Sequence, residues 1–361
     1  MIPVYKPSIG KKELEYVTDA VKSTWISSRG KYLDRFEKDF AKFCGAKYSV
    51  ATCNGTVSIH LALEALGIGK GDEVIVPTFT YIASVNSITY TGAKPVFVES
   101  DKNNWNIDVN DIEKKITKKT KAIMVVHLYG HPSEMGPILK IAKKHNIYVV
   151  EDAAESHGAL YKGKKVGAIG DIGSFSFFGN KTITTGEGGM IVTNSKKLAD
   201  KARHLRGQGV SLKKNYWHDV VGYNYRMTNI AAAIGVAQLE RINSIIKRKR
   251  EIAKLYFQEL KDVKELVLQR EMPWAKSVFW MVSILAPKGK RDSLMKYLAK
   301  NGVDSRPFFY PAHIMPPYKQ NKKYSVAEDI ASRGINLPSY PELTDNEIVK
   351  IANTIKRFFK K

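Results

Sequence analysis

A lysine and an aspartate, Lys181 and Asp152, carry the strongest chemical signal in the sequence. Lys181 follows an apolar run with Phe175, Phe177 and Phe178, which predicts a buried strand, and it precedes a cluster of glycines. An ammonium group at a strand end, between aromatic residues and glycines, loses part of its hydration, as a lysine that forms a Schiff base must. The simpler alternative is a lysine whose aliphatic stem covers the edge of the core. This stretch alone does not separate the two.

Asp152 ends a second apolar run, earlier in the chain. An acidic residue there is often only a helix cap. Parallel strands, however, end at the same edge of a sheet, so Asp152 and Lys181 can lie together. Pyridoxal phosphate chemistry requires such a pair: a lysine that condenses with the cofactor and moves the proton, and a carboxylate that keeps the pyridine nitrogen protonated.

Three other positions could complete a cofactor site. Tyr81 lies just past a predicted strand end and could stack on a pyridine ring. Gly55 and Thr56 open a predicted helix and, with Ser176, could hold a phosphate, because the first N–H groups of a helix are free. This last signal is weak by itself, since any helix cap looks similar.

The elements that must position these residues alternate between strands and helices. Strands are predicted at 48–52, 73–76, 95–98, 122–127, 148–150, 174–178 and 190–193, and helices at 33–43, 137–145, 195–206, 230–240 and 242–261. Such alternation predicts an α/β fold with a parallel or mostly parallel central sheet that is covered on both faces. We expect a large domain over 1–245 and a smaller C-terminal α/β domain over 246–361, with a strand at 278–285 and helices at 291–301 and 345–359.

Composition narrows the class of protein. The 361 residues are 43% hydrophobic and 26% charged, as in a soluble globular protein. No apolar run approaches the ~18 residues of a membrane span, and the N-terminus has no apolar signal core, so a cytoplasmic protein without a membrane partner is expected. Two cysteines, Cys44 and Cys53, are too few for a disulfide framework or a cysteine-ligated metal site.

The net charge of +23 raises the alternative of a nucleic-acid-binding protein. Lysine and arginine are nevertheless spread over the whole chain, and the dense stretches at 114–121 and 247–250 lie among helix-like residues. Solvated basic faces explain both stretches better, so no nucleic-acid partner is expected.

The histidine pair His127 and His131 does not predict a metal site. Gly130 and Pro132 argue against a helix that would bring both rings to one ion, and no carboxylate stands beside them in the sequence. We interpret both as structural histidines and expect no metal.

Several motifs together resemble one family. The strings E-D-A-A-E, S-F-S-F-F-G-N-K, T-T-G-E-G-G-M, G-Y-N-Y-R-M-T and A-A-I-G resemble the DegT/DnrJ/EryC1/StrS sugar-nucleotide aminotransferases, which are fold type I enzymes that depend on pyridoxal 5'-phosphate. The resemblance extends over nearly the whole chain.

The resemblance implies a role for each matching residue. Lys181 would form the Schiff base and Asp152 would bind the pyridine nitrogen. Glu155 stands where many members have glutamine, near the phenolic oxygen of the cofactor, which departs from the commonest pattern. The remaining implied residues are Tyr81 on the ring; Gly55, Thr56 and Ser176 on the phosphate; Asn224 on the phosphate of the neighbouring subunit; and Trp25, Arg306 and His313 in the substrate pocket.

The activity implied is amino transfer from L-glutamate to C4 of a nucleotide-linked 4-keto-6-deoxy sugar, in a homodimer with shared active sites. GDP-4-keto-6-deoxy-D-mannose is the preferred acceptor, and a UDP- or dTDP-linked 4-keto-6-deoxy hexose is the alternative. Sugar 3-dehydratases of the same family replace the lysine by histidine or add an iron–sulfur cluster. Lys181 and the presence of only two cysteines argue against both.

Overall fold

The computed structural model describes residues 1–211 and 213–360. Its centre is a seven-stranded sheet with the strand order β1-β9-β8-β5-β4-β2-β3. Neighbouring strands run parallel except at β9, which pairs antiparallel with β1 and β8. The strands are β1 Tyr48–Thr52, β2 Glu73–Pro77, β3 Lys94–Val98, β4 Thr120–Val126, β5 Tyr148–Asp152, β8 Ile172–Ser176 and β9 Gly189–Thr193. The prediction of an α/β fold with a mostly parallel sheet is confirmed.

Helices cover both faces of this sheet, because consecutive side chains of a strand point to opposite sides. Val50 of β1 packs in the hydrophobic cluster under α3 and α7, whereas Ala51 packs in the cluster under α2 and α8. Both residues are fully buried. The helices of this part are α1 Lys11–Lys22, α2 Lys31–Cys44, α3 Gly55–Leu66, α4 Ile82–Tyr90, α5 Val109–Ile112, α6 Met135–His145, α7 Lys196–Arg206 and α8 Asn229–Glu240.

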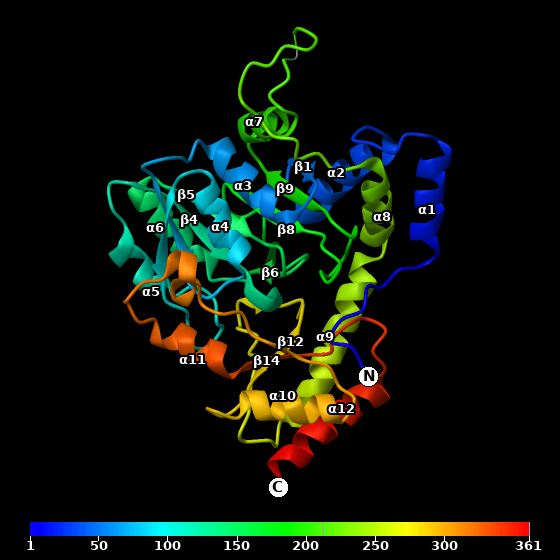
Figure 1. The fold of residues 1–361 in the computed structure, drawn as a ribbon, viewed down its shortest axis with the longest axis vertical. Coiled ribbons are helices and arrows are strands. Elements are labelled where there is room, and N and C mark those ends of the chain that lie inside the picture. Colours follow the sequence, from blue (N-terminus) through cyan, green and yellow to red (C-terminus); the bar gives the residue numbers. More distant parts are fainter. Residues whose placement is uncertain (212, 361) are drawn as a thin grey trace.

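A second, antiparallel sheet with the order β10-β12-β14-β13 lies at the other end of the long helix α9, beside α10 and α12 (Figure 1). It has a hydrophobic cluster of its own. The helices and strands of this C-terminal part of the chain are α9 Ile242–Leu260, β10 Val267–Leu268, β12 Val282–Leu285, α10 Arg291–Lys300, β13 Arg306–Pro307, α11 Ser325–Arg333, β14 Gly334–Leu337 and α12 Asp345–Phe359. Since α9 begins at Ile242, the predicted domain boundary at 245/246 would fall inside a helix, and it stays a prediction.

Several predicted details differ from the structure; the strand predicted at 278–285, for example, begins only at Val282. Helix α1, which packs against α8, was not predicted, although Leu14, Val17 and Val21 have helical spacing. The strand β8 ends at Ser176, two residues before its predicted end, and Phe178 is 48% exposed. The prediction that Phe178 belongs to the buried strand was therefore wrong: the chain leaves the sheet there to form the turn that carries Lys181.

An arm of polypeptide projects beyond α7 (Figure 1). Among its described residues, Tyr216 and Val221 are almost fully exposed and Trp217 is about half exposed. Such apolar side chains on a projecting segment are typical of a surface that another chain covers. Nowhere in residues 1–211 and 213–360 is there a helix long and apolar enough to cross a membrane.

Candidate active site

A pocket of about 520 Å³ opens at the carboxyl ends of β5 and β8, where open α/β sheets characteristically bind ligands. The structure brings most of the predicted cofactor residues to its wall: Gly55, Thr56, Tyr81, Asp152, Glu155, Ser176 and Lys181. They come from five separate stretches of sequence, which only the folded sheet brings together. Their placement in one pocket agrees with the predicted roles, which stay predictions.

Lys181 lies in the turn after β8, and its backbone N–H donates to the carbonyl of Phe178 at 2.9 Å. Its Nζ lies 3.6 Å from Oε1 of Glu155 and 4.2 Å from the ring centroid of Trp280. The hydroxyl of Tyr5 donates to the carbonyl oxygen of Lys181 at 2.7 Å. The amino group is thus held between a carboxyl and an aromatic face, in a side chain that is only 11% exposed.

Asp152 ends β5 and has both carboxylate oxygens hydrogen-bonded. Ser84 Oγ of α4 donates to Oδ2 at 2.7 Å, and the backbone N–H of Ala154 donates to Oδ1 at 3.1 Å. Thr80 Oγ1 lies 3.0 Å from Ser84 Oγ and extends the network. A buried carboxylate fixed in this way is suited to bind a protonated ring nitrogen, because charge-assisted hydrogen bonds gain strength when both partners are already oriented.

Glu155 is the second carboxyl group of the pocket. Its Oε2 accepts a hydrogen bond from the backbone N–H of Tyr129 at 2.8 Å. Burial raises the pKa of Glu155 to about 7, and the nearby charge of Asp152 adds to this, while Lys181 and the Tyr129 hydrogen bond oppose it. A carboxyl group with this pKa exchanges its proton near neutral pH and can either donate to or accept from a neighbouring phenolic oxygen.

This pKa predicts a pH-dependent stability. Because the folded-state pKa of Glu155 lies above the ordinary carboxyl value of 4.5, its stabilising contribution is complete below about pH 4.5 and is lost as the pH rises through about 7. From pH 4.5 to 8 the free energy of unfolding of the cofactor-free protein should fall by ~2–3 kcal/mol more than that of Glu155→Gln. Denaturant titrations of both proteins at several pH values measure this. If the unfolding free energies of the two proteins change in parallel with pH, this prediction is contradicted.

The start of α3 has the geometry expected of the predicted phosphate cradle. A Cβ at Gly55 would lie 2.6 Å from Cβ of Ser176, so only glycine allows the helix to start this close to β8. Asn54 Oδ1 caps the helix by accepting from Val57 N at 3.0 Å. The N–H groups of Gly55 and Thr56 have no intrahelical acceptor and remain for a ligand. Together with the lysine, the two carboxyl groups and the ring of Tyr81, this cradle fits pyridoxal phosphate.

Four predicted residues lie outside this pocket. Arg306 lines an adjoining cavity of about 660 Å³ that shares Tyr81 and Trp280 with it, and Arg306 pairs with Asp304 at 3.4 Å. Asn224 and Trp25 are exposed on the surface. The structure does not bring His313 to either cavity.

The ring of His313 is fully engaged elsewhere. Its Nδ1 lies 2.7 Å from Thr78 Oγ1 and its Nε2 lies 3.2 Å from Oε1 of Glu328, and the residue is buried. A buried histidine whose two ring nitrogens both have hydrogen-bond partners is typical of a structural residue, so the geometry does not favour the predicted substrate contact.

Sequence reasoning missed Trp280, Ser84 and Tyr129. Trp280 lines both cavities, faces Lys181, and donates from Nε1 to the carbonyl of Asn180 at 2.7 Å. Its position at the start of a predicted strand was a usable signal, because aromatic residues at strand ends often form ligand walls. Ser84 contacts Asp152 from α4, and the backbone N–H of Tyr129 contacts Glu155. No local sequence pattern indicated either contact.

The structure gives His127 a carboxylate partner that the sequence did not indicate. His127 lacks a carboxylate neighbour in sequence, yet its Nε2 lies 2.9 Å from Glu151 Oε2 and the pair is fully buried. Glu151 also accepts from the backbone N–H groups of Gly167, Ile169 and Gly170. Burial raises the pKa of Glu151, but the His127 contact, followed by the Gly170 and Gly167 hydrogen bonds, holds it below the usual range. Both groups are satisfied by protein partners. In the described part of the chain no three His, Cys, Asp or Glu residues are grouped as metal ligands.

Comparison with known proteins agrees with this geometry. The model of the DegT/DnrJ/EryC1/StrS aminotransferase family matches residues 7–356. The chain is 55% identical to GDP-perosamine synthase of Escherichia coli O157:H7, covering 99% of this chain and 98% of that protein, and 49% identical to GDP-perosamine synthase of Vibrio cholerae, covering 99% of each. Its fold matches the PLP-form of the putative sugar aminotransferase Spr1654 from Streptococcus pneumoniae with a TM-score of 0.94 at 28% identity, over 99% of this chain and 98% of that chain. The chain belongs to the DegT/DnrJ/EryC1/StrS aminotransferase family.

Proposed function

We propose that this protein is a pyridoxal-phosphate-dependent aminotransferase that converts GDP-4-keto-6-deoxy-D-mannose to GDP-perosamine, with L-glutamate as amino donor. The observation that carries the acceptor is the near-full-length identity of about half the residues with two proteins named GDP-perosamine synthase. The observation that carries the chemistry is the pocket in which Lys181 lies between Glu155 and Trp280, with Asp152 on the same wall. The UDP- and dTDP-linked sugars are not favoured.

Each residue of the pocket has a task in this reaction. Pyridoxal phosphate, when bound, supplies an aldehyde that condenses with amines and a ring that accepts electrons. Asp152, which accepts from Ser84, would keep the ring nitrogen protonated. Lys181 Nζ would take the proton from Cα of the donor and deliver it to C4′ of the cofactor. Glu155 would lie near the phenolic oxygen, and Tyr81 would cover the ring.

The adjoining cavity offers room for the rest of the acceptor. Arg306 stands there with 65% of its side chain exposed, and the walls shared with the Lys181 pocket include Tyr81 and Trp280. A guanidinium group suits a diphosphate because it offers several donors in one plane. We therefore place the nucleotide diphosphate in the cavity of Arg306 and the keto sugar beside Lys181.

An assay of the purified, cofactor-loaded enzyme tests the proposal. It pairs L-glutamate with the GDP-, UDP- and dTDP-linked 4-keto-6-deoxy sugars in turn, repeats the best acceptor with L-aspartate and with L-alanine, and follows the gain of an amino group by mass spectrometry. We expect the highest kcat/KM with GDP-4-keto-6-deoxy-D-mannose. A preference for a UDP- or dTDP-linked sugar would refute the acceptor, and a preference for L-aspartate or L-alanine over L-glutamate would refute the donor.

We further propose that the enzyme is a homodimer with active sites shared between subunits. The projecting arm exposes Tyr216, Trp217 and Val221, which a second copy would bury. Asn224 follows the arm on the surface, where its Oδ1 accepts from Nε of Arg226 at 3.1 Å. It does not line the Lys181 pocket of its own chain, which supports a contact with the phosphate cradle of a partner.

Mixed dimers test the sharing. Chains with Lys181→Ala and chains with Asn224→Ala should each form impaired homodimers, whereas a heterodimer regains one site that holds both native residues. Activity should therefore recover on mixing, to about half of the native activity per heterodimer if the two sites act independently. The heterodimer is purified with two affinity tags. Lack of recovery in proven heterodimers would place Asn224 in the site of its own subunit.

A further inference from the structure

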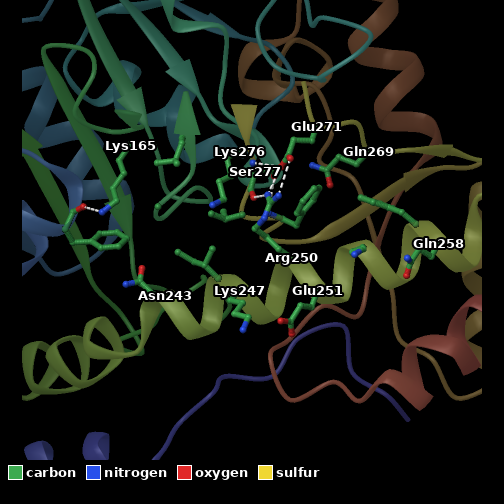
Figure 2. A pocket seen from close by; sticks show the side chains of 18 of the residues that line it. Lys165, Asn243, Lys247, Arg250, Glu251, Gln258, Gln269, Glu271, Lys276 and Ser277 are labelled. Atoms are coloured by element: carbon green, nitrogen blue, oxygen red, sulfur yellow. Dashed lines mark hydrogen bonds and ion pairs between the residues drawn. The ribbon is translucent and has the colours of Figure 1, made fainter. Parts of the chain in front are cut away.

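A third cavity, of about 950 Å³, lies along α9, between that helix, the hairpin of β6 Leu160–Tyr161 and β7 Lys164–Lys165, and the segment 269–279 (Figure 2). Among the described residues it shares no lining side chain with the Lys181 pocket or with the cavity of Arg306. Its size is that of a site for a small molecule. The proposed aminotransferase reaction does not use it.

Positive charge dominates its lining. The cationic residues are Lys165, Lys247, Arg250, Lys254, Lys261 and Lys276, and the acidic ones are Glu251 and Glu271. Both acids are already paired: Glu271 Oε2 with Arg250 NH1 at 2.5 Å, and Glu251 Oε2 with Arg248 NH1 at 3.7 Å. Figure 2 shows Arg250 reaching from α9 to Glu271 and the carbonyl of Ser277. The five lysines have no carboxylate partner within the described residues, so no protein carboxylate neutralises their charges.

The lysines of α9 form a row. Lys247 and Lys254 of α9 and Lys261, which directly follows the helix as its C-cap, are spaced by seven residues, which places them on one side of the helix about 10 Å apart along its axis. All three are exposed. Lys165 lines the cavity from the hairpin, with its Nζ 3.9 Å from the ring centroid of Phe43 and bonded to the Phe43 carbonyl (Figure 2). Cations from two sides of a cavity suit a ligand that carries several phosphates.

The cavity also has an apolar wall and an unused amide. Phe257 is half-buried and packs edge-on against Phe279, with ring centroids 5.5 Å apart, so part of its surface remains for a flat ring. Gln269 is only 6% exposed, and its buried Oε1 has no hydrogen-bond partner. Native proteins rarely leave such an atom unpaired, which points to a polar partner that enters from the cavity.

We propose that this cavity binds a nucleoside triphosphate at a site separate from the active site. The lysines of α9 and Lys165 hold the phosphates, the base packs against Phe257, and a polar group of the base or ribose bonds to Gln269. An inorganic polyanion would contact only the lysines. A nucleoside without phosphates would contact only Phe257 and Gln269.

Calorimetric titration of the cofactor-loaded enzyme with GTP and with ATP tests the site. The variant Lys247→Glu/Lys254→Glu should bind either nucleotide about tenfold or more weakly, because each substitution replaces an attraction by a repulsion. Phe257→Ala should weaken nucleotide binding and leave the binding of tripolyphosphate unchanged. Adenosine and guanosine should bind far more weakly than the triphosphates. Melting temperatures establish that the variants are folded.

A matched control comes from another basic surface, around Lys118 and Lys121, which lies in a shallow depression without an aromatic wall. The variant Lys118→Glu/Lys121→Glu changes the net charge by the same amount and should bind the nucleotides within about twofold of the native affinity. Equal loss in both double variants would show a non-specific effect of net charge and overturn the proposal. Tripolyphosphate that binds as tightly as GTP would overturn the nucleotide assignment, as would nucleotide affinity that is unchanged in Lys247→Glu/Lys254→Glu.

Discussion

Replacement of Lys181 by alanine should lower amino transfer by at least about 10³-fold, because the pocket then lacks the group that links to the cofactor and moves the proton. The fold should survive. The Lys181 side chain lies at the wall of a pocket, and its Nζ has one carboxylate partner at 3.6 Å, so its removal leaves no tightly paired charge behind. Single-turnover assays with L-glutamate measure the effect.

Lys181→Arg is the matched control for charge. It keeps a cation between Glu155 and Trp280 but cannot condense with an aldehyde, so it should be as inactive as the alanine variant. Borohydride treatment of the native, cofactor-loaded protein should attach the cofactor to the peptide that contains Lys181, as read by mass spectrometry. Substantial turnover by either variant, or attachment to a different lysine, would show that Lys181 does not have this role.

Asp152→Asn should keep the cofactor bound but slow the reaction by about 10²-fold or more, on the scale of ~3 kcal/mol for lost preorganised electrostatics. The amide occupies the same volume and can accept from Ser84, yet it carries no charge to stabilise a protonated ring nitrogen. The pH dependence of cofactor absorbance should shift with the rate. A loss below about tenfold, with unchanged absorbance, would mean that another group holds the ring nitrogen.

Ser84→Ala tests how the carboxylate is positioned. It removes the 2.7 Å hydrogen bond to Asp152 Oδ2 and should give a smaller loss of rate in the same direction, with a smaller shift in absorbance. Ser87→Ala is the control: this serine is equally buried on the same helix and donates to the carbonyl of Thr56 at 3.0 Å, without contacting Asp152. Equal spectral shifts in both variants would point to a general disturbance of α4.

Local sequence pattern was enough to predict the central sheet and the lysine–carboxylate pair. The segments of β5 and β8 are largely apolar and are followed by polar or glycine-rich turns, so Asp152 at the end of β5 and Lys181 past β8 could be located. Because parallel strands end at one edge of a sheet, the two residues could then be expected near each other. The glycine at position 55 likewise marked the place where a helix begins against the sheet.

The side chains that complete the pocket come from the docking of segments that are distant in sequence. Trp280 reaches Lys181 across about a hundred residues of sequence, and Ser84 reaches Asp152 from a helix that the pattern does not connect with β5. His313 stands in a loop that looked like a substrate loop, yet packing turns its ring toward Thr78 and Glu328. Contacts of this kind depend on how distant segments dock and on which partner satisfies each buried polar atom, and neither is encoded in the local periodicity of the chain.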